Sequence, residues 1–210
     1  MAIRILPFRQ YDENDVINMF AWDGTVNAKP SDTTSDAGVL VSVASGDVTG
    51  GYNPTVLSQN DALLGSSDYP HVARNYYPEV PLKVDACPTG SPEDALGITL
   101  AQTLTHDEND ENLLRYPQKK AELFAVSPGE AVPVATKGIF TLSETAFHGG
   151  TINGAHKSIK ASTNTAGMLE TEANATAASI GKILVVGKRE SQNGNADQFA
   201  GKYAVIKLDC

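Results

Sequence analysis

The stretches "GKILVVGK" (Gly181–Lys188) and "GKYAVIKL" (Gly201–Leu208) decide how this sequence folds. Both begin with Gly-Lys and are rich in β-branched residues, which favour the extended conformation of a strand. The segment between them, "RESQNGNADQFA", contains Asn-Gly, a dipeptide typical of tight hairpin turns. We therefore predict that the two stretches are paired antiparallel strands.

Further strand-like segments precede this pair. The turn signature "SPGE" is followed by "AVPVAT" and "KGIFTLS", each of which has the composition of a strand. The following segment, residues 148–180, is rich in Ala, Thr, Gly and Asn and fits short strands and loops. The sequence thus predicts a mainly β fold, with an antiparallel β-barrel or sandwich in the C-terminal half, over residues 119–210.

Residues 1–118 are predicted to form an irregular, turn-rich, extended N-terminal region with short strands and an arm. Nine of the eleven prolines lie at or before Pro117, and each removes a backbone donor and restricts the residue before it. Residues 66–97 are nevertheless too apolar for a disordered linker, so they need a surface to lie on. "GVLVSVAS" (residues 38–45) is typical of a strand, whereas "VINMFAW" (residues 16–22) is too short to separate a strand from a helical turn.

The distribution of charge changes at the same boundary, between residues 118 and 119. The net charge is −9, but residues 1–118 carry 17 acidic and 6 basic side chains, a net −11, while residues 119–210 carry 8 and 10, a net +2. An acidic front half repels phosphate backbones and anionic lipid, so we expect no nucleic-acid or membrane partner. The asymmetry favours salt-dependent head-to-tail contact between copies. The chain has no apolar run of about 18 residues and no secretory signal, so we expect synthesis in a cytosol.

The tetrapeptide "DEND" occurs twice, at residues 12–15 and 107–110. A calcium-binding EF-hand loop needs a glycine at its sixth position and a glutamate at its twelfth. Counted from Asp12 the sixth residue is Ile17, and counted from Asp107 it is Asn112, so both copies fail. Each copy precedes an apolar stretch, where an Asp side chain can cap the backbone amides that follow. We interpret both copies as turn and cap sequences.

No cysteine or histidine pattern indicates a metal or redox centre. Cys87 and Cys210 lack metal-type spacing, and a reducing compartment disfavours a disulfide. The histidines are expected to be solvated or to make local hydrogen bonds, with His106 beside a carboxylate; they are His71, His106, His148 and His156. G-x-S-x-G, G-x-G-x-x-G, H-E-x-x-H and phosphate-loop motifs are absent from the sequence. We therefore expect no catalytic residue, no metal and no cofactor.

Several phrases resemble head-associated structural proteins of tailed bacteriophages. "PGEAVPVATKGIFTLSETAF", "IGKILVVGK" and "FAGKYAVIKLD" carry the likeness in the C-terminal half. The opening "MAIRILPFRQYDENDVINMFAW" and "ALGITLAQTL" are similar to virion structural proteins of cyanophages in particular. The resemblance implies a capsid decoration (cement) protein, located on the capsid surface of the virion and synthesised in the host cytoplasm. Its implied partners are the major capsid protein and further copies of itself, for example in a trimer.

The resemblance implies contact residues but no catalytic ones. If the opening residues and the apolar extended segment lie on a neighbour, the contact candidates are Ile3, Ile5, Leu6, Phe8, Tyr76 and Tyr77. Core packing is the alternative for each of them. Under the arm hypothesis, deleting about the first twenty residues should leave a folded barrel that binds the shell more weakly.

Three other classes stay open at this point. A carbohydrate-binding or host-recognition β module would expose aromatic platforms, which Tyr76 and Tyr77 could supply. A structural component of a phage tail or baseplate would have the same β-rich sequence. A hydrolase with dispersed carboxylates would need a pair of them to converge in a cavity.

Overall fold

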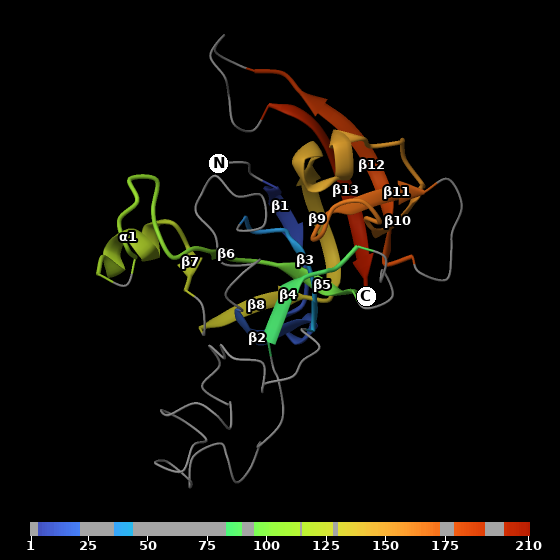
Figure 1. The fold of residues 1–210 in the computed structure, drawn as a ribbon. Coiled ribbons are helices and arrows are strands. Elements are labelled where there is room, and N and C mark those ends of the chain that lie inside the picture. Colours follow the sequence, from blue (N-terminus) through green and yellow to red (C-terminus); the bar gives the residue numbers. More distant parts are fainter. Residues whose placement is uncertain are drawn as a thin grey trace, which may run out of the picture.

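The computed structural model describes residues 4–21, 36–43, 83–89, 95–113, 115–127, 130–172, 179–191 and 200–210. These residues form a mainly β structure with antiparallel sheets, which confirms the predicted fold class. One sheet has six strands, all paired antiparallel (Figure 1). Its order is β1 (Ile5–Gln10), β9 (Lys137–Ser143), β13 (Gly201–Asp209), β12 (Gly181–Arg189), β10 (Ser158–Ala161) and β11 (Leu169–Glu172).

The predicted C-terminal strand pair is confirmed as β12 and β13. Val185 lies opposite Val205 and Gly187 lies opposite Tyr203, with an irregularity in the register between Ile183 and Val185. Residue 187 is a glycine because a Cβ there would lie 2.4 Å from the ring of Tyr203. The aromatic ring therefore covers the bare backbone of its cross-strand neighbour.

A second set of five strands closes into a ring. In order they are β2 (Val16–Ala21), β4 (Lys83–Ala86), β3 (Leu40–Val43), β5 (Ala95–Thr99) and β8 (Ala131–Ala135), and β8 pairs back with β2. Only the β2–β4 pair of this ring is parallel. The ambiguous segment "VINMFAW" thus contains a strand. Gly97 lets β5 approach β8, because a Cβ at this position would lie 2.2 Å from the carbonyl oxygen of Ala135.

Strand pairing crosses the compositional boundary between residues 118 and 119. β1 pairs with β9, and β8 closes the ring with β2 and β5. The two regions therefore differ in charge and proline content but share both sheets. This contradicts the expectation that the first twenty residues could be removed from an intact barrel, since they supply both β1 and β2.

The main core lies where the six-stranded sheet meets the ring. Its fully buried side chains include Phe140, Leu142, Ile183, Ala204, Ile206 and Leu208 from the sheet and Leu40, Ile98 and Ala135 from the ring. Alternate residues of β13 enter this core, as a half-buried strand requires.

The remaining elements are short. The α-helix α1 (Pro117–Glu122) lies beside β7 (Ala125–Val126), which pairs in parallel with β6 (Gln102–Thr103), away from the two sheets (Figure 1). The described residues also include three 3-10 turns: η1 (Glu13–Asp15), η3 (Glu144–Ala146) and η4 (His148–Gly150). Among the residues that the structure describes, no helix has the length and apolar character needed to span a membrane.

Candidate functional site

The outer face of the six-stranded sheet, the side turned away from the core, carries exposed apolar side chains. Val185 of β12 and Val205 of β13 lie in one row with Thr141 of β9, which is itself buried. Phe8 of β1 has 59% of its surface exposed, and Val185 has 52%. These side chains do not pack into the core on the opposite side of the sheet, so their exposed apolar surface is accessible to a partner.

A hollow of about 470 Å³ lies on this face beside β1. We call it the Phe8 hollow; it is lined by Leu6, Pro7, Phe8, Thr141, Lys188, Arg189, Tyr203 and Val205. Its lining is largely apolar and aromatic, and Lys188 and Arg189 contribute positive charge. Aromatic residues and arginine are the types enriched in the centres of protein interfaces.

The predicted contact residues lie in different environments in the structure. Leu6 and Phe8 both line the Phe8 hollow, but Phe8 is exposed whereas Leu6 is buried, with 9% of its surface exposed. Ile5 packs against the core from the other side of the strand, opposite Leu142, so its core alternative holds. Ile3 and the pair Tyr76 and Tyr77 lie outside the described residues.

Sequence reasoning missed Val185, Tyr203 and Val205 as surface residues. The alternation in "GKYAVIKL" contained the signal for two of them, since Tyr203 and Val205 alternate with the buried Ala204 and Ile206. No local signal could have placed β1 beside them, because that neighbour is distant in sequence.

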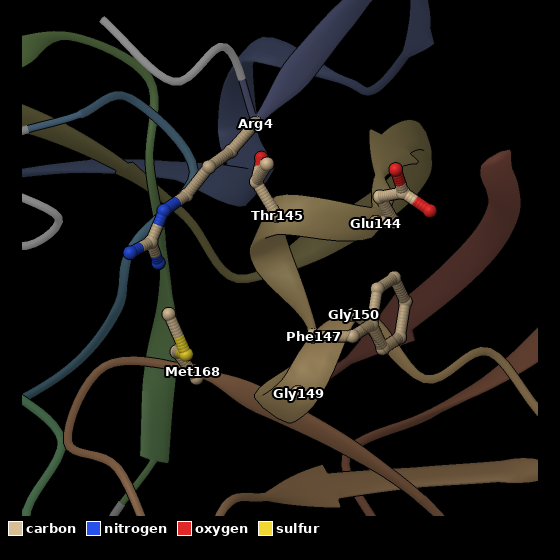
Figure 2. Close-up of a pocket in the computed structure, with 7 residues that line it drawn as sticks. All are labelled: Arg4, Glu144, Thr145, Phe147, Gly149, Gly150 and Met168. Atoms are coloured by element: carbon tan, nitrogen blue, oxygen red, sulfur yellow. The ribbon is translucent and has the colours of Figure 1, made fainter. Parts of the chain in front are cut away.

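A second hollow, of about 490 Å³, lies between the start of β1 and the 3-10 turns η3 and η4 (Figure 2). Its lining residues are Arg4, Glu144, Thr145, Phe147, Gly149, Gly150 and Met168. Figure 2 shows the guanidinium of Arg4 directed toward Met168, while the carboxylate of Glu144 points away from both. The two charged groups do not converge on one point, so this hollow does not assemble an acid–base pair of the kind that hydrolysis needs.

The side chain of Arg4 is instead buried and makes its contacts inside the protein. Its side chain is 1% exposed, its Nη1 donates to the carbonyl oxygen of Gly167 at 3.1 Å, and its Nε lies 3.9 Å from Oδ2 of Asp36. Asp36 is 5% exposed. Burial raises the pKa of Asp36 to about 6, although the positive charge of Arg4 opposes that rise. Burial also lowers the pKa of Arg4, against the attraction of Asp36.

This pair predicts a pH dependence of stability. The folded-state pKa of Asp36 exceeds its ordinary 3.8, so between pH 4 and 6 the folded protein keeps a proton that the unfolded chain releases. The resulting stabilisation is full below pH 4 and is lost as pH rises to about 6, a change of roughly 3 kcal/mol. We expect urea titrations to show that, from pH 4 to pH 6, the free energy of unfolding of the wild type falls by about this amount relative to that of Asp36→Asn. A difference between the two proteins that stays constant with pH would contradict the assignment.

The interpretation of the "DEND" segments as turns and caps is confirmed. Oδ1 of Asp12 accepts from the backbone amide of Asn14 at 2.9 Å, and Oδ1 of Asp107 accepts from those of Asn109 and Glu111 at 2.8 Å each. Over the described ranges, no group of three or more His, Cys, Asp or Glu side chains is placed to hold a metal ion.

Two histidines make local hydrogen bonds, as expected. Nδ1 of His148 lies 2.9 Å from Oγ1 of Thr165. Nδ1 of His106 lies 2.9 Å from Oγ1 of Thr105, so its partner is a hydroxyl group where a carboxylate was expected. His71 lies outside the described residues.

Comparisons with known proteins do not place the chain in a family. No family model, no curated protein and no solved structure matches it.

Proposed function

We propose that this chain is a non-enzymatic virion structural protein, a capsid decoration protein that binds the outer surface of a phage head and stabilises the shell. The observation that carries the proposal is the Phe8 hollow, an apolar surface with an exposed aromatic side chain that no described part of the chain covers. The resemblance of the C-terminal half to head-associated phage proteins supplies the kind of partner.

A sheet face suits such a role because its contact residues are already ordered. β9, β13 and β12 are paired through their backbones, and β1 pairs with β9 at Ile5, Arg9 and Gln10, on both sides of an irregularity that contains Phe8. Docking on this face therefore costs little conformational entropy in the backbone. Burying Phe8 would remove apolar surface from water, at about 25 cal/mol per Å². Each contact can be weak, since many copies on a symmetric shell raise the effective concentration of neighbouring sites.

Replacing Phe8 with serine tests the proposal. We expect Phe8→Ser to bind emptied, expanded cyanophage heads about tenfold more weakly than the wild type, because it removes a central aromatic anchor. The measurement is co-sedimentation of the purified protein with the heads over a range of protein concentrations. Tyr116→Ser is the matched control, since Tyr116 is also an exposed aromatic residue (47%) but lies at the start of α1.

Two results would contradict the proposal. One is wild-type protein that does not sediment with heads at any concentration tested. The other is Phe8→Ser protein that binds as well as the Tyr116→Ser control. Clear binding on a glycan array without affinity for heads would support the host-recognition alternative instead.

A further inference from the structure

One end of the six-stranded sheet carries positive charge on two neighbouring strands. Lys182, at the start of β12, lies directly opposite Lys207, near the end of β13, and both side chains are exposed. Like charges directly opposite one another in a sheet are destabilising. Asp209 is the nearby carboxylate, but it also holds Lys137, with 2.9 Å between Nζ and Oδ1. Lys137 and Asp209 neutralise each other, so the excess charge of +2 comes from Lys182 and Lys207, which we call the lysine cluster.

An acidic turn lies at the same end of the sheet, beside β1 and the start of β9. Asp12, Glu13 and Asp15 lie in the turn between β1 and β2, with Asp12 and Glu13 exposed. The turn is held beside the start of β9, because the backbone amide of Thr136 donates to the carbonyl oxygen of Asp15 at 2.9 Å. The acidic turn contributes a charge of −3 within four residues.

Strand order separates the two clusters by a fixed distance. The order β1, β9, β13, β12 places the acidic turn at β1, Lys207 two strands away and Lys182 three strands away, roughly 10 Å and 14 Å at the usual spacing between strands. Ile139 lies between them, opposite both Gln10 and Lys207, together with the Lys137–Asp209 ion pair that joins the ends of β9 and β13. This end of the sheet, which we call the charged end, is therefore acidic beside β1, close to neutral at the ion pair in the middle, and basic at Lys207 and Lys182.

We propose that the charged end docks on the charged end of a second copy of this chain, about a two-fold axis. A two-fold interface uses the same patch on both molecules, so it needs both halves of each contact within that patch. Rotation by two-fold symmetry reverses the row of charges, and each acidic turn then faces the lysine cluster of its neighbour. This replaces the head-to-tail contact expected from the sequence, because the structure puts both signs of charge at one end.

A polyanionic partner fits this end less well than a second copy does. Nucleic acid or anionic lipid attracted to Lys182 and Lys207 would meet the acidic turn roughly 10–14 Å away, on a chain with a net charge of −9. A second copy satisfies both clusters at once. The interface lies apart from the Phe8 hollow, so self-association does not depend on the proposed shell contact.

Charge exchange in the full chain tests this interface. One variant reverses the lysine cluster, Lys182→Glu with Lys207→Glu, and the other reverses the acidic turn, Glu13→Lys with Asp15→Lys. Asp12 is kept because it caps its own turn. By sedimentation velocity, we expect the wild type to dimerise and each variant alone to dimerise at least about tenfold more weakly. An equimolar mixture of the two variants, and a single chain with all four changes, should dimerise again.

The other end of the same hairpin provides the matched control. Lys188 and Lys202 also lie opposite each other, so Lys188→Glu with Lys202→Glu makes the same change in charge on the same strands, away from the charged end. The control should dimerise like the wild type, as should Phe8→Ser. Reversing Lys182 and Lys207 replaces one like-charge pair by another, so the monomer should keep its circular dichroism spectrum.

The proposal is overturned by any of three results. The wild type could stay monomeric at low salt, the mixture of variants could fail to restore the dimer, or the control could lose it as well. Raising the salt from 0.1 M to 1 M should weaken the wild-type dimer, since screening shortens from about 10 Å to 3 Å. A salt-independent dimer would also refute the proposal. Head binding is measured separately, so its failure leaves this result standing.

Discussion

Arg4→Ala is expected to lower the free energy of unfolding by about 3–5 kcal/mol at neutral pH, which is the usual loss when one partner of a buried ion pair is removed. Arg4 lies immediately before β1 and is 1% exposed, so no water can replace it easily. Its removal leaves the carboxylate of Asp36 buried without its cation and deprives the carbonyl oxygen of Gly167 of a donor. Urea denaturation of the purified variant measures the loss.

The pH dependence of this loss separates charge from packing. At pH 4 and below, Asp36 is protonated in the folded protein, so removing Arg4 leaves no buried negative charge without a partner. The free energy of unfolding should therefore fall less at this pH than at neutral pH. The double variant Arg4→Met with Asp36→Leu should also lose less than Arg4→Ala at neutral pH, because apolar residues of similar size can replace a buried pair. A loss below about 1 kcal/mol for Arg4→Ala, or one equal at both pH values, would show that the pair is not electrostatically coupled.

Phe140→Ala is expected to cost about 3–5 kcal/mol, as large-to-small substitutions of buried aromatic residues do. Phe140 is fully buried in β9 between β1 and β13, opposite Arg9 and Ile206. Its ring stacks on that of Tyr11 at a centroid distance of 5.7 Å. The substitution therefore opens a cavity in the main core and removes an aromatic contact to the segment that follows β1. Thermal and urea unfolding both measure it.

The adjacent residue gives the control for Phe140→Ala. Thr141 points to the outer face of the same strand, and its buried hydroxyl has no hydrogen-bond partner among the residues that the structure describes. Thr141→Val keeps the shape and removes that hydroxyl, so its effect on stability should be neutral or slightly favourable. If Phe140→Ala cost no more than Thr141→Val, the main core would not lie where the two sheets meet.

These two substitutions also bear on the proposed shell contact, because both act on β1. Arg4 holds the start of this strand and Phe140 lies beneath its end, while Phe8 projects from the middle of it. The exposed aromatic side chain thus stands on a strand that the interior fixes at both ends. A contact residue held in this way loses little freedom when a partner covers it.

Local patterns were sufficient for the features that involve neighbouring residues. The alternation in "GKYAVIKL" and the Asn-Gly dipeptide, which itself lies outside the described residues, identified the β12–β13 pair, and the spacing of polar groups identified Asp12 and Asp107 as caps. Each of these depends on a backbone conformation and on side chains within a few residues of one another. Composition likewise indicated a mainly β fold.

The sequence by itself therefore determined the strand type, the terminal hairpin and the capped turns of this protein. Only the tertiary structure decided that β1 lies beside β9, that β8 closes the ring with β2, and that Arg4, 163 residues before Gly167, is buried against it. The Phe8 hollow and the charged end both arise from these distant pairings. The physical reason is that alternation depends only on adjacent residues, whereas the choice between possible strand neighbours depends on burying several distant segments in one core at the same time.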